Sequence, residues 1–311
     1  MVEQRAPLNP PGPPPVRPQP SRSRIAARRA IALVLLAGGL GALAWLAAFA
    51  VGGIRDGGKK ATPTVPVAPP ALRIVFPEGF TRAQMAERIT VVDGIARERR
   101  KVNPRLSARG YLKATASSKI PGKFAGDHER RALEGFLFPA TYEFEPATTS
   151  RQLVNRQLES FQRNWAKVDL GYAKSKHLTP YDVLIIASMI EKEVIAPEER
   201  ALVAAVIYNR LHDGMVLGID ATIRYGLGVP PTEPLHESQL NDLTTPYNTR
   251  KFPGLPPTPI ANPGLASIQA AAHPAKVDYL FFVRKPEDKD HHFFTASEQE
   301  FDNYKKAHGY G

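Results

Sequence analysis

The sequence contains no cysteine among its 311 residues. That absence excludes disulfide-stabilised scaffolds, thiol nucleophiles and cysteine-ligated metal sites. Gly-x-Ser-x-Gly elbows and glycine-rich phosphate loops are also missing, which removes the usual signatures of serine hydrolases and nucleotide-binding proteins. Eight histidines are present, but none has a ligand spacing such as His-Glu-x-x-His. We therefore expect no metal and no other cofactor.

Positive charge is concentrated at one end of the chain. Residues 1–60 hold nine Lys/Arg against two Asp/Glu, whereas the remaining residues hold 32 against 28. A nucleic-acid-binding protein concentrates positive charge on its folded part, so this distribution argues against nucleic acid as a partner.

The positively charged N-terminal part of the chain surrounds an uncharged apolar run at residues 31–53. Its length is sufficient to cross a hydrocarbon core of roughly 30 Å. Six arginines precede the run and few cations follow it, which predicts a cytoplasmic N-terminus and an extracytoplasmic C-terminal part. A cleaved signal peptide is the alternative, but the apolar run and the leader before it are both too long for one. We expect a single-pass membrane anchor.

The remaining pattern predicts an α+β protein with several parts. Residues 1–30, rich in Pro and Arg, are expected to form a disordered tail, and residues 54–72 a linker. Residues 73–128 predict a small strand–turn–helix module, in which Thr81 caps the helix. Residues 129–311 predict a second, mixed α+β domain. Nine prolines between residues 230 and 263 make long loops there, and long ordered loops are usually functional.

The most informative segment is 184–194, Leu-Ile-Ile-Ala-Ser-Met-Ile-Glu-Lys-Glu-Val. It is apolar on all sides before Glu191, which predicts a buried helix. Thr179, Pro180 and Asp182 have the types expected for the N-cap, N1 and N3 positions of this helix. Burial near Glu191 would raise the pKa of its carboxyl and make it a proton donor near neutral pH. The alternative is that Glu191 is only the solvated end of a core helix.

A second carboxylate is harder to find from the sequence. Glycoside hydrolysis usually requires two, at separations of about 5 Å or about 6.5–9.5 Å. Glu193 follows Glu191 by two residues, so on a helix it points to a different side. Asp220 and Glu233 lie in the loop region and are candidates for a cleft, although Asp220 equally fits the cap of a helix that begins at Ala221.

Several motifs together resemble one known family. They are ASMIEKE at 187–193, DATIRYG at 220–226, PYNT at 246–249, GLPPTPIANPG at 254–264, AHPA at 272–275, LEGFLFPATYEF at 133–144 and FPEG at 76–79. Their order is similar to that of the membrane-anchored endolytic murein transglycosylases, the YceG-like family. The resemblance covers about residues 72–295.

The resemblance implies both a reaction and a site. Glu191 would be the single catalytic acid and base, cleaving the MurNAc–GlcNAc bond of nascent peptidoglycan strands to leave 1,6-anhydroMurNAc ends. No second enzymic carboxylate is then required, because the nucleophile is the substrate's own C6 hydroxyl. Residues 73–128 would be a LysM-like module, and cell-wall synthases are possible partners. By resemblance and polarity, the expected substrate-binding residues are Asp220, Thr222, Tyr225, Tyr247 and Asn248.

Two departures and two alternatives accompany this interpretation. Gly218 stands where the family commonly has Gln, and Arg250 stands where it often has an aromatic residue, so sugar preference is open. A non-catalytic glycan-binding or division-scaffold protein would use the same cleft without chemistry. A muramidase that uses water would give reducing ends instead of anhydro ends.

Overall fold

The computed structural model describes residues 72–116, 120, 124 and 132–310, all of which belong to one compact unit. The expected tail and anchor, and the expected linker up to residue 71, lie outside these residues. Within the described part of the chain, no helix is both long and apolar enough to span a membrane.

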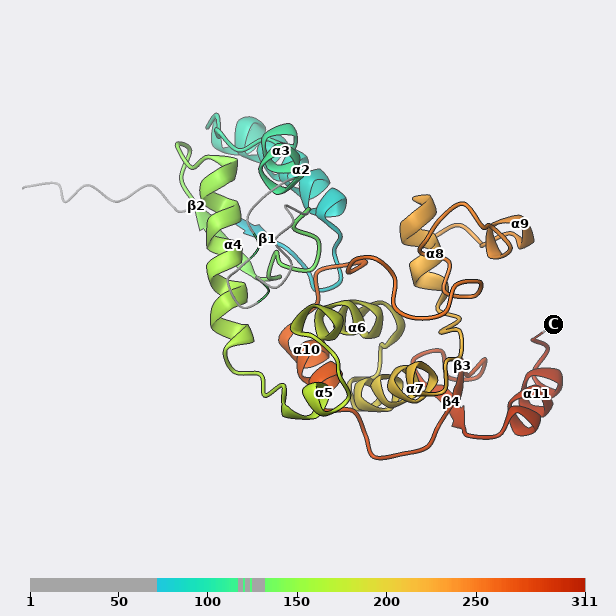
Figure 1. The fold of residues 1–311 in the computed structure, drawn as a ribbon. Coiled ribbons are helices and arrows are strands. Elements are labelled where there is room, and N and C mark those ends of the chain that lie inside the picture. The colour runs from blue at the N-terminus through green and yellow to red at the C-terminus, as the bar shows by residue number, and fades with distance from the viewer. Residues whose placement is uncertain (1–71, 117–119, 121–123, 125–131, 311) are drawn as a thin grey trace, which may run out of the picture. The chain divides into compact units, whose positions relative to one another are not determined.

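Helices dominate the described residues, with two small antiparallel sheets (Figure 1). The elements in order are β1 (Leu72–Val75), α2 (Arg82–Arg100), α3 (Ala108–Ala116), β2 (Thr141–Phe144), α4 (Ser150–Trp165), α5 (Gly171–Ser175), α6 (Pro180–Glu193), the 3-10 helix η2 (Pro197–Glu199), α7 (Arg200–His212), α8 (Asp220–Leu227), α9 (Glu237–Leu240), α10 (Leu265–Ala272), β3 (Phe281–Arg284), β4 (His292–Thr295) and α11 (Glu298–Ala307). The predicted α+β class is confirmed.

The first module forms as its local sequence predicts. Thr81 caps α2 by accepting a hydrogen bond from Gln84 N at 3.2 Å, and the Gln84 side chain accepts one from Thr81 N at 2.9 Å. This reciprocal arrangement satisfies two of the free N–H groups at the helix start. Helix α2 then runs unbroken to Arg100.

The sheet of this module crosses the domain boundary expected at residues 128/129. β1 pairs with β2 in antiparallel register, with Ile74 opposite Tyr142. Helix α3 packs against α4, and the buried Tyr111 hydroxyl donates to Gln157 Oε1 at 2.8 Å. Residues 72–116 therefore share one hydrophobic core with residues 141–165.

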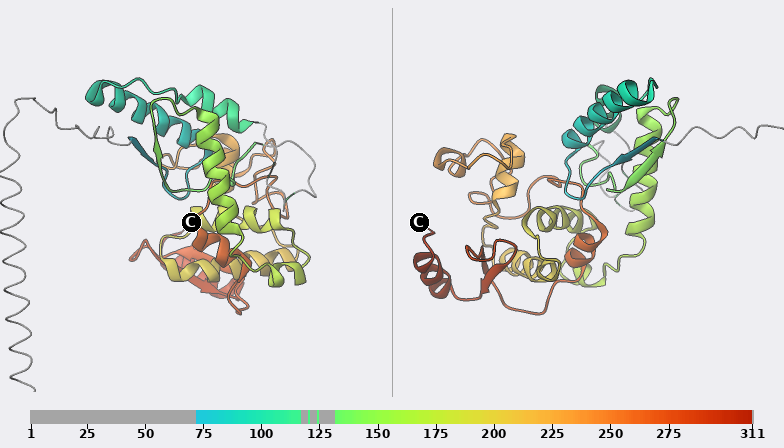
Figure 2. Two further views of the ribbon diagram at one scale, coloured as in Figure 1. Left: turned by 90° about the vertical axis from the view of Figure 1, so that its left-hand side faces the viewer. Right: turned by 180° about the vertical axis from the view of Figure 1, so that it is seen from behind.

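Helix α6 is the centre of the other half of the core. Thr179 is its N-cap, Pro180 its first residue and Asp182 its N3 residue, as predicted. Every residue from Val183 to Ile190 is buried, because α7 and α10 pack beside the helix (Figures 1 and 2). Only the two ends of α6, residues 180–182 and 191–193, are partly exposed.

The C-terminal hairpin closes the other side of α7. β3 and β4 pair antiparallel, with Phe281 opposite Thr295, and they contact α7 and α11 (Figure 2). His292 on β4 is fixed to Glu199 on η2: its Nδ1 lies 2.6 Å from Glu199 Oε2, and its backbone N–H donates to Glu199 Oε1 at 2.9 Å. Both side chains are buried. This contact fixes the connection that follows α6.

Candidate active site

Glu191 is partly buried at the C-terminal end of α6. The loop of residues 259–264 forms hydrogen bonds with the side of α6 that carries Glu191. Gly264 N donates to Glu191 Oε2 at 3.1 Å, and Ile260 N donates to Ser188 Oγ at 3.0 Å. Ser188 and Glu191 are three residues apart, so they lie on one side of the helix. The rigid helix and the fastened loop together fix the position of one carboxyl group.

The surroundings of Glu191 favour its protonated form. Burial is the largest cause that raises the pKa of this carboxyl, and the negative charge of Glu78 raises it further. The Ser267 hydroxyl, the Gly264 N–H and the positive charge of Arg200 act in the opposite direction, but the net shift of the pKa is upward. A partly exposed carboxyl with a raised pKa is suited to proton donation near neutral pH.

Ser267 on α10 is a neighbour of Glu191 that sequence reasoning missed. Its side chain is completely buried, and its Oγ has no partner at full hydrogen-bond geometry among the described residues. It nevertheless lies close enough to lower the pKa of Glu191. Buried hydroxyls normally have a hydrogen-bond partner, and the Glu191 carboxyl is the group on which this one acts.

Glu78 is a second carboxylate at this site, and it was also missed. It belongs to the turn after β1, in a segment for which we expected no titratable group of interest. An added Cβ at Gly264 would overlap the Glu78 carboxyl, and one at the neighbouring Gly79 would lie 3.5 Å from Glu191 Cγ. The sequence marked this segment only through the FPEG motif. Because the motif is far from Glu191 along the chain, nothing in the sequence indicated that Glu78 lies near Glu191.

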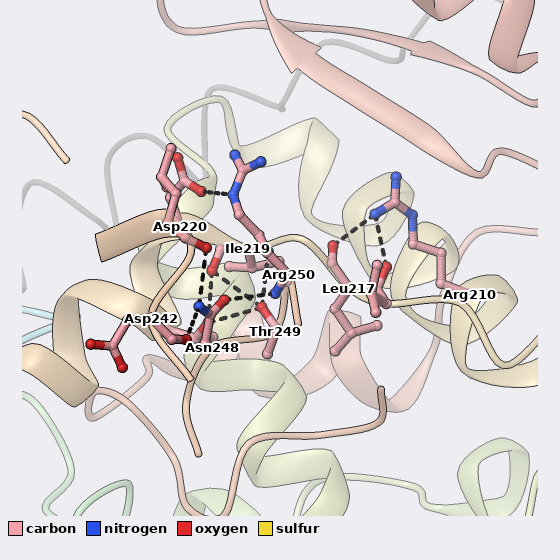
Figure 3. Close-up of polar contacts among 11 residues, drawn as sticks. Arg210, Leu217, Ile219, Asp220, Asp242, Asn248, Thr249 and Arg250 are labelled. Carbon is pink, nitrogen blue, oxygen red and sulfur yellow. Dashed lines mark hydrogen bonds and ion pairs between the residues drawn. The ribbon is translucent and has the colours of Figure 1, made fainter. Parts of the chain in front are cut away.

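Asp220 lies at the other side of the end of α6, beside Glu193. Its Oδ1 forms an ion pair with Arg250 Nε at 2.7 Å (Figure 3). Burial raises the pKa of Glu193 to about 7, and Asp220 contributes to the rise, while Arg284 opposes it. Asp220 is the first residue of α8, and Ile219 is the N-cap. The alternative that Asp220 caps a helix beginning at Ala221 is therefore wrong, because its carboxylate is used by Arg250.

The two departures from the family pattern lie next to this ion pair. Gly218 has a left-handed φ of 65° and donates its N–H to Thr249 O at 2.8 Å. Arg210 holds the preceding turn through Leu217 O at 2.8 Å (Figure 3). Arg250 thus supplies a charge partner for Asp220, and Gly218 permits a tight turn before α8.

Thr222 and Asn248 are internal residues. Both side chains are completely buried. Thr222 Oγ1 donates to Ile219 O at 2.7 Å. Asn248 Nδ2 donates to Leu240 O at 3.1 Å. The same Asn248 amide donates to Asp242 O at 2.6 Å (Figure 3). With their polar atoms used in this way, they shape the loops and have no exposed surface to offer a ligand.

Tyr225 and Tyr247 lie together as a partly exposed aromatic pair. Their ring centroids are 5.2 Å apart in an edge-to-face arrangement. Both hydroxyls have partners within the protein: Tyr225 donates to Glu134 Oε2 at 3.2 Å, and Tyr247 lies 2.8 Å from Thr258 Oγ1. Only the exposed parts of these rings remain available to a ligand.

Glu134 connects this pair to the loop of residues 259–264. Arg82 N donates to both of its carboxyl oxygens, at 3.0 and 3.2 Å, and Asn262 Nδ2 donates to Oε1 at 2.7 Å. Burial is the main cause that raises the pKa of Glu134, to about 7. This buried acid was missed because its motif suggested only an extended groove-lining stretch.

The sequence matches the model of the YceG-like family over residues 56–307. The chain belongs to the YceG-like family. This confirms the resemblance drawn from the motifs.

Curated members of the family include an endolytic murein transglycosylase of Bacillus subtilis (strain 168), 31% identical over 218 residues. That alignment covers 69% of this chain and 59% of the relative. An endolytic murein transglycosylase of Streptococcus pneumoniae (strain ATCC BAA-255 / R6) is 33% identical over 238 residues, covering 70% of this chain and 41% of the relative. The chain therefore spans about half the length of these YceG-like relatives.

A solved structure agrees with this family assignment. The crystal structure of a YceG-like protein from Listeria monocytogenes matches with a TM-score of 0.64 and 29% identity, covering 77% of each chain. The fold of the described residues is thus that of a known YceG-like structure.

Proposed function

We propose that this chain is an endolytic lytic transglycosylase that cuts peptidoglycan glycan strands, with Glu191 as its catalytic acid and base. The observation that carries the proposal is the state of Glu191: a partly exposed carboxyl on a rigid helix end, with a raised pKa and one backbone donor. The relatives named endolytic murein transglycosylase supply the substrate class and reaction type.

The proposed reaction uses one carboxyl group twice, first as an acid and then as a base. Protonated Glu191 gives its proton to the oxygen of the MurNAc–GlcNAc bond, which breaks and releases the GlcNAc hydroxyl. The resulting carboxylate then takes the proton of the muramoyl C6 hydroxyl as that oxygen bonds to C1 of the same sugar. A hydroxyl held in the same molecule reacts at high effective concentration, so no activated water is needed. The products are a 1,6-anhydroMurNAc end and a protonated Glu191.

The substrate contacts divide into two kinds. We propose that the rings of Tyr225 and Tyr247, together with the Asp220–Arg250 ion pair, border the sugar path, because all four side chains are at least partly exposed. Thr222 and Asn248 would act indirectly, by holding the loops that carry these groups.

The cellular setting follows from the sequence. We propose that residues 31–53 anchor the chain in the cell membrane with its N-terminus in the cytoplasm, and that the part with Glu191 works outside. Residues 73–128 would form a LysM-like element, and cell-wall synthases would be the partners whose new strands are cut.

The decisive experiment is digestion of purified peptidoglycan by the full chain and by Glu191→Gln. We expect the variant to lose anhydro products by roughly a thousandfold, since general acid–base catalysis contributes about 10²–10⁴. Glu87→Gln, an exposed change of the same type on α2, is the matched control and should leave product release unchanged. Equal release by Glu191→Gln and the wild type would overturn the assignment.

The same digest distinguishes two other functions. Glu78 beside Glu191 provides the second carboxylate that a muramidase using water would require, so hydrolysis is the main rival. Its products have reducing ends and are heavier by one water, which mass spectrometry detects. Retained glycan binding with no cleavage product from the wild type would indicate a non-catalytic scaffold.

A further inference from the structure

We propose that Glu78 is a positioning residue of the active site, which acts on Glu191 across Gly264 and makes the turn of residues 77–80 a working part of the enzyme. The inference rests on the proposed function, because it assigns a partner to the acid named there. It assigns the first module a chemical role besides binding or spacing.

The turn of residues 77–80 forms hydrogen bonds both with the loop of residues 259–264 and with α6. Gly79 N donates to Asn262 O at 3.0 Å, and Asn262 N donates to Phe80 O at 3.0 Å. The Asn262 side chain donates to the same Phe80 oxygen at 2.9 Å. From α6, Lys192 Nζ reaches Gly79 O at 3.4 Å. Backbone bonds on both sides of Gly79 thus hold Glu78 in one position relative to α6.

Both carboxyls, that of Glu191 and that of Glu78, lie close to Gly264. Its N–H donates to Glu191 Oε2 at 3.1 Å, and its lack of a side chain leaves room for the Glu78 carboxyl. Gly79 makes a similar close approach: its φ of 74° suits glycine, and an added Cβ would stand 3.5 Å from Glu191 Cγ. Two glycines therefore permit the two acids to lie on either side of one backbone segment.

The charge of Glu78 is not compensated by a direct partner. Its side chain is exposed, and within residues 72–116 and 132–310 no side chain forms an ion pair or hydrogen bond with it. The charged groups that act on Glu191 from other elements are Glu78, from the turn, and Arg200, from α7. On α6 itself, Lys192 contacts the turn, and Glu193 is controlled by Asp220 and Arg284.

An uncompensated carboxylate at this position assists both halves of the reaction. A nearby negative charge disfavours ionisation of Glu191, so more of the enzyme carries the proton needed for the first step. After donation, the same charge makes the Glu191 carboxylate a stronger base toward the C6 hydroxyl. Glu78 itself exchanges no proton and forms no bond.

The direct test is a titration that does not depend on turnover. The full chain, labelled with ¹³C at the glutamate carboxyl, is titrated by NMR, and the Glu191 signal is identified by its loss in Glu191→Gln. We expect Glu78→Gln to move the midpoint of Glu191 to lower pH and Glu87→Gln to leave it unchanged. An unchanged midpoint in Glu78→Gln would overturn the proposal, even if the wild type proved to be no transglycosylase.

A rate profile provides the second readout. Product release by Glu78→Gln should fall roughly three- to tenfold at pH 7.5, and the loss should shrink as the pH falls and Glu191 gains its proton in both proteins. Glu78→Asp keeps the charge on a shorter side chain and should lie between the two. A loss of equal size at every pH would instead indicate a purely structural role for Glu78.

Discussion

Glu191 and Glu134 are held by the same loop, yet their surroundings differ. Gly264 donates to Glu191, and Asn262, two residues earlier, donates to Glu134. Burial raises the pKa of both carboxyls. Glu134 is almost completely buried and receives donors from Arg82 N, Tyr225 and Asn262, whereas Glu191 is partly exposed and receives one backbone N–H at full geometry.

The difference separates a structural acid from the acid that we propose to be reactive. A raised pKa alone does not identify a catalyst, because structural networks also perturb titration. Glu134 connects α2, α8 and the loop, and no solvent or sugar can reach its oxygens. Glu191 is partly exposed and accepts a single backbone hydrogen bond, from Gly264. Exposure together with incomplete hydrogen bonding therefore distinguishes the acid that we propose as the proton donor.

The largest effect is expected from removing the structural acid, Glu134, and it is an effect on the free energy of unfolding. Glu134→Ala leaves the Arg82 N–H, the Asn262 amide and the Tyr225 hydroxyl without their buried acceptor. We expect the free energy of unfolding to fall by about 3 to 4 kcal/mol, since loss of a buried network is among the most damaging single changes. Urea denaturation of the full chain measures this, with Glu87→Ala as the exposed control. A loss below about 1 kcal/mol would mean that Glu134 is not a structural centre.

The second effect is a pH dependence of stability that belongs to Glu134. Its pKa is about 7 in the folded protein, above the ordinary value of 4.5, so the folded state binds the proton more tightly. This contribution is fully present below pH 4.5 and is lost as the pH rises to about 7. The linked free energy is about 3 kcal/mol.

Glu134→Gln removes this titration while keeping the side-chain shape. The difference in unfolding free energy between wild type and Glu134→Gln should therefore change between pH 4.5 and 7 and then level off. Denaturation curves at a series of pH values measure it, and the contributions of other groups cancel in the difference. A difference that is constant with pH would contradict the raised pKa.

Local patterns in the sequence predicted the framework of the site well. The Thr179–Pro180–Asp182 start, the buried run after it and the emergence of Glu191 at the helix end are all confirmed. These features depend on residues a few positions apart, where helix periodicity and capping rules apply directly. The capping of α2 by Thr81 was predicted for the same reason.

Contacts between distant segments were not predictable in this way. The approach of Glu78 to Glu191 requires two glycines and the fastening of a turn to a loop far along the chain. Thr222, on α8, and Asn248, in a loop, show the reverse difficulty, because a polar side chain can bind either a ligand or the protein's own backbone. Their complete burial decides in favour of the backbone, and the sequence pattern in this region did not reveal that burial.

The smallest expected effects come from the hydroxyls beside the two acids, Ser267 and Tyr225. Ser267→Ala removes a buried hydroxyl that has no partner at full geometry, so the free energy of unfolding should change by less than about 0.5 kcal/mol. The group nevertheless acts on the Glu191 carboxyl. Its loss should raise the pKa of Glu191 but also remove a contact that orients the carboxyl. We expect the loss of orientation to dominate and to reduce anhydro product release by roughly three- to tenfold, corresponding to about 1 kcal/mol of transition-state stabilisation.

Tyr225→Phe is the matched change beside the structural acid and should behave in the opposite way. It removes one donor to buried Glu134, which should cost about 1 kcal/mol of unfolding free energy, while the ring that borders the sugar path stays in place. Product release should remain within about twofold of wild type, as the ring and not the hydroxyl is exposed to sugar. If Tyr225→Phe lowered activity more than Ser267→Ala, the hydroxyl beside Glu134 would belong to the catalytic machinery. The assignment of a structural role to Glu134 and a reactive role to Glu191 would then be wrong.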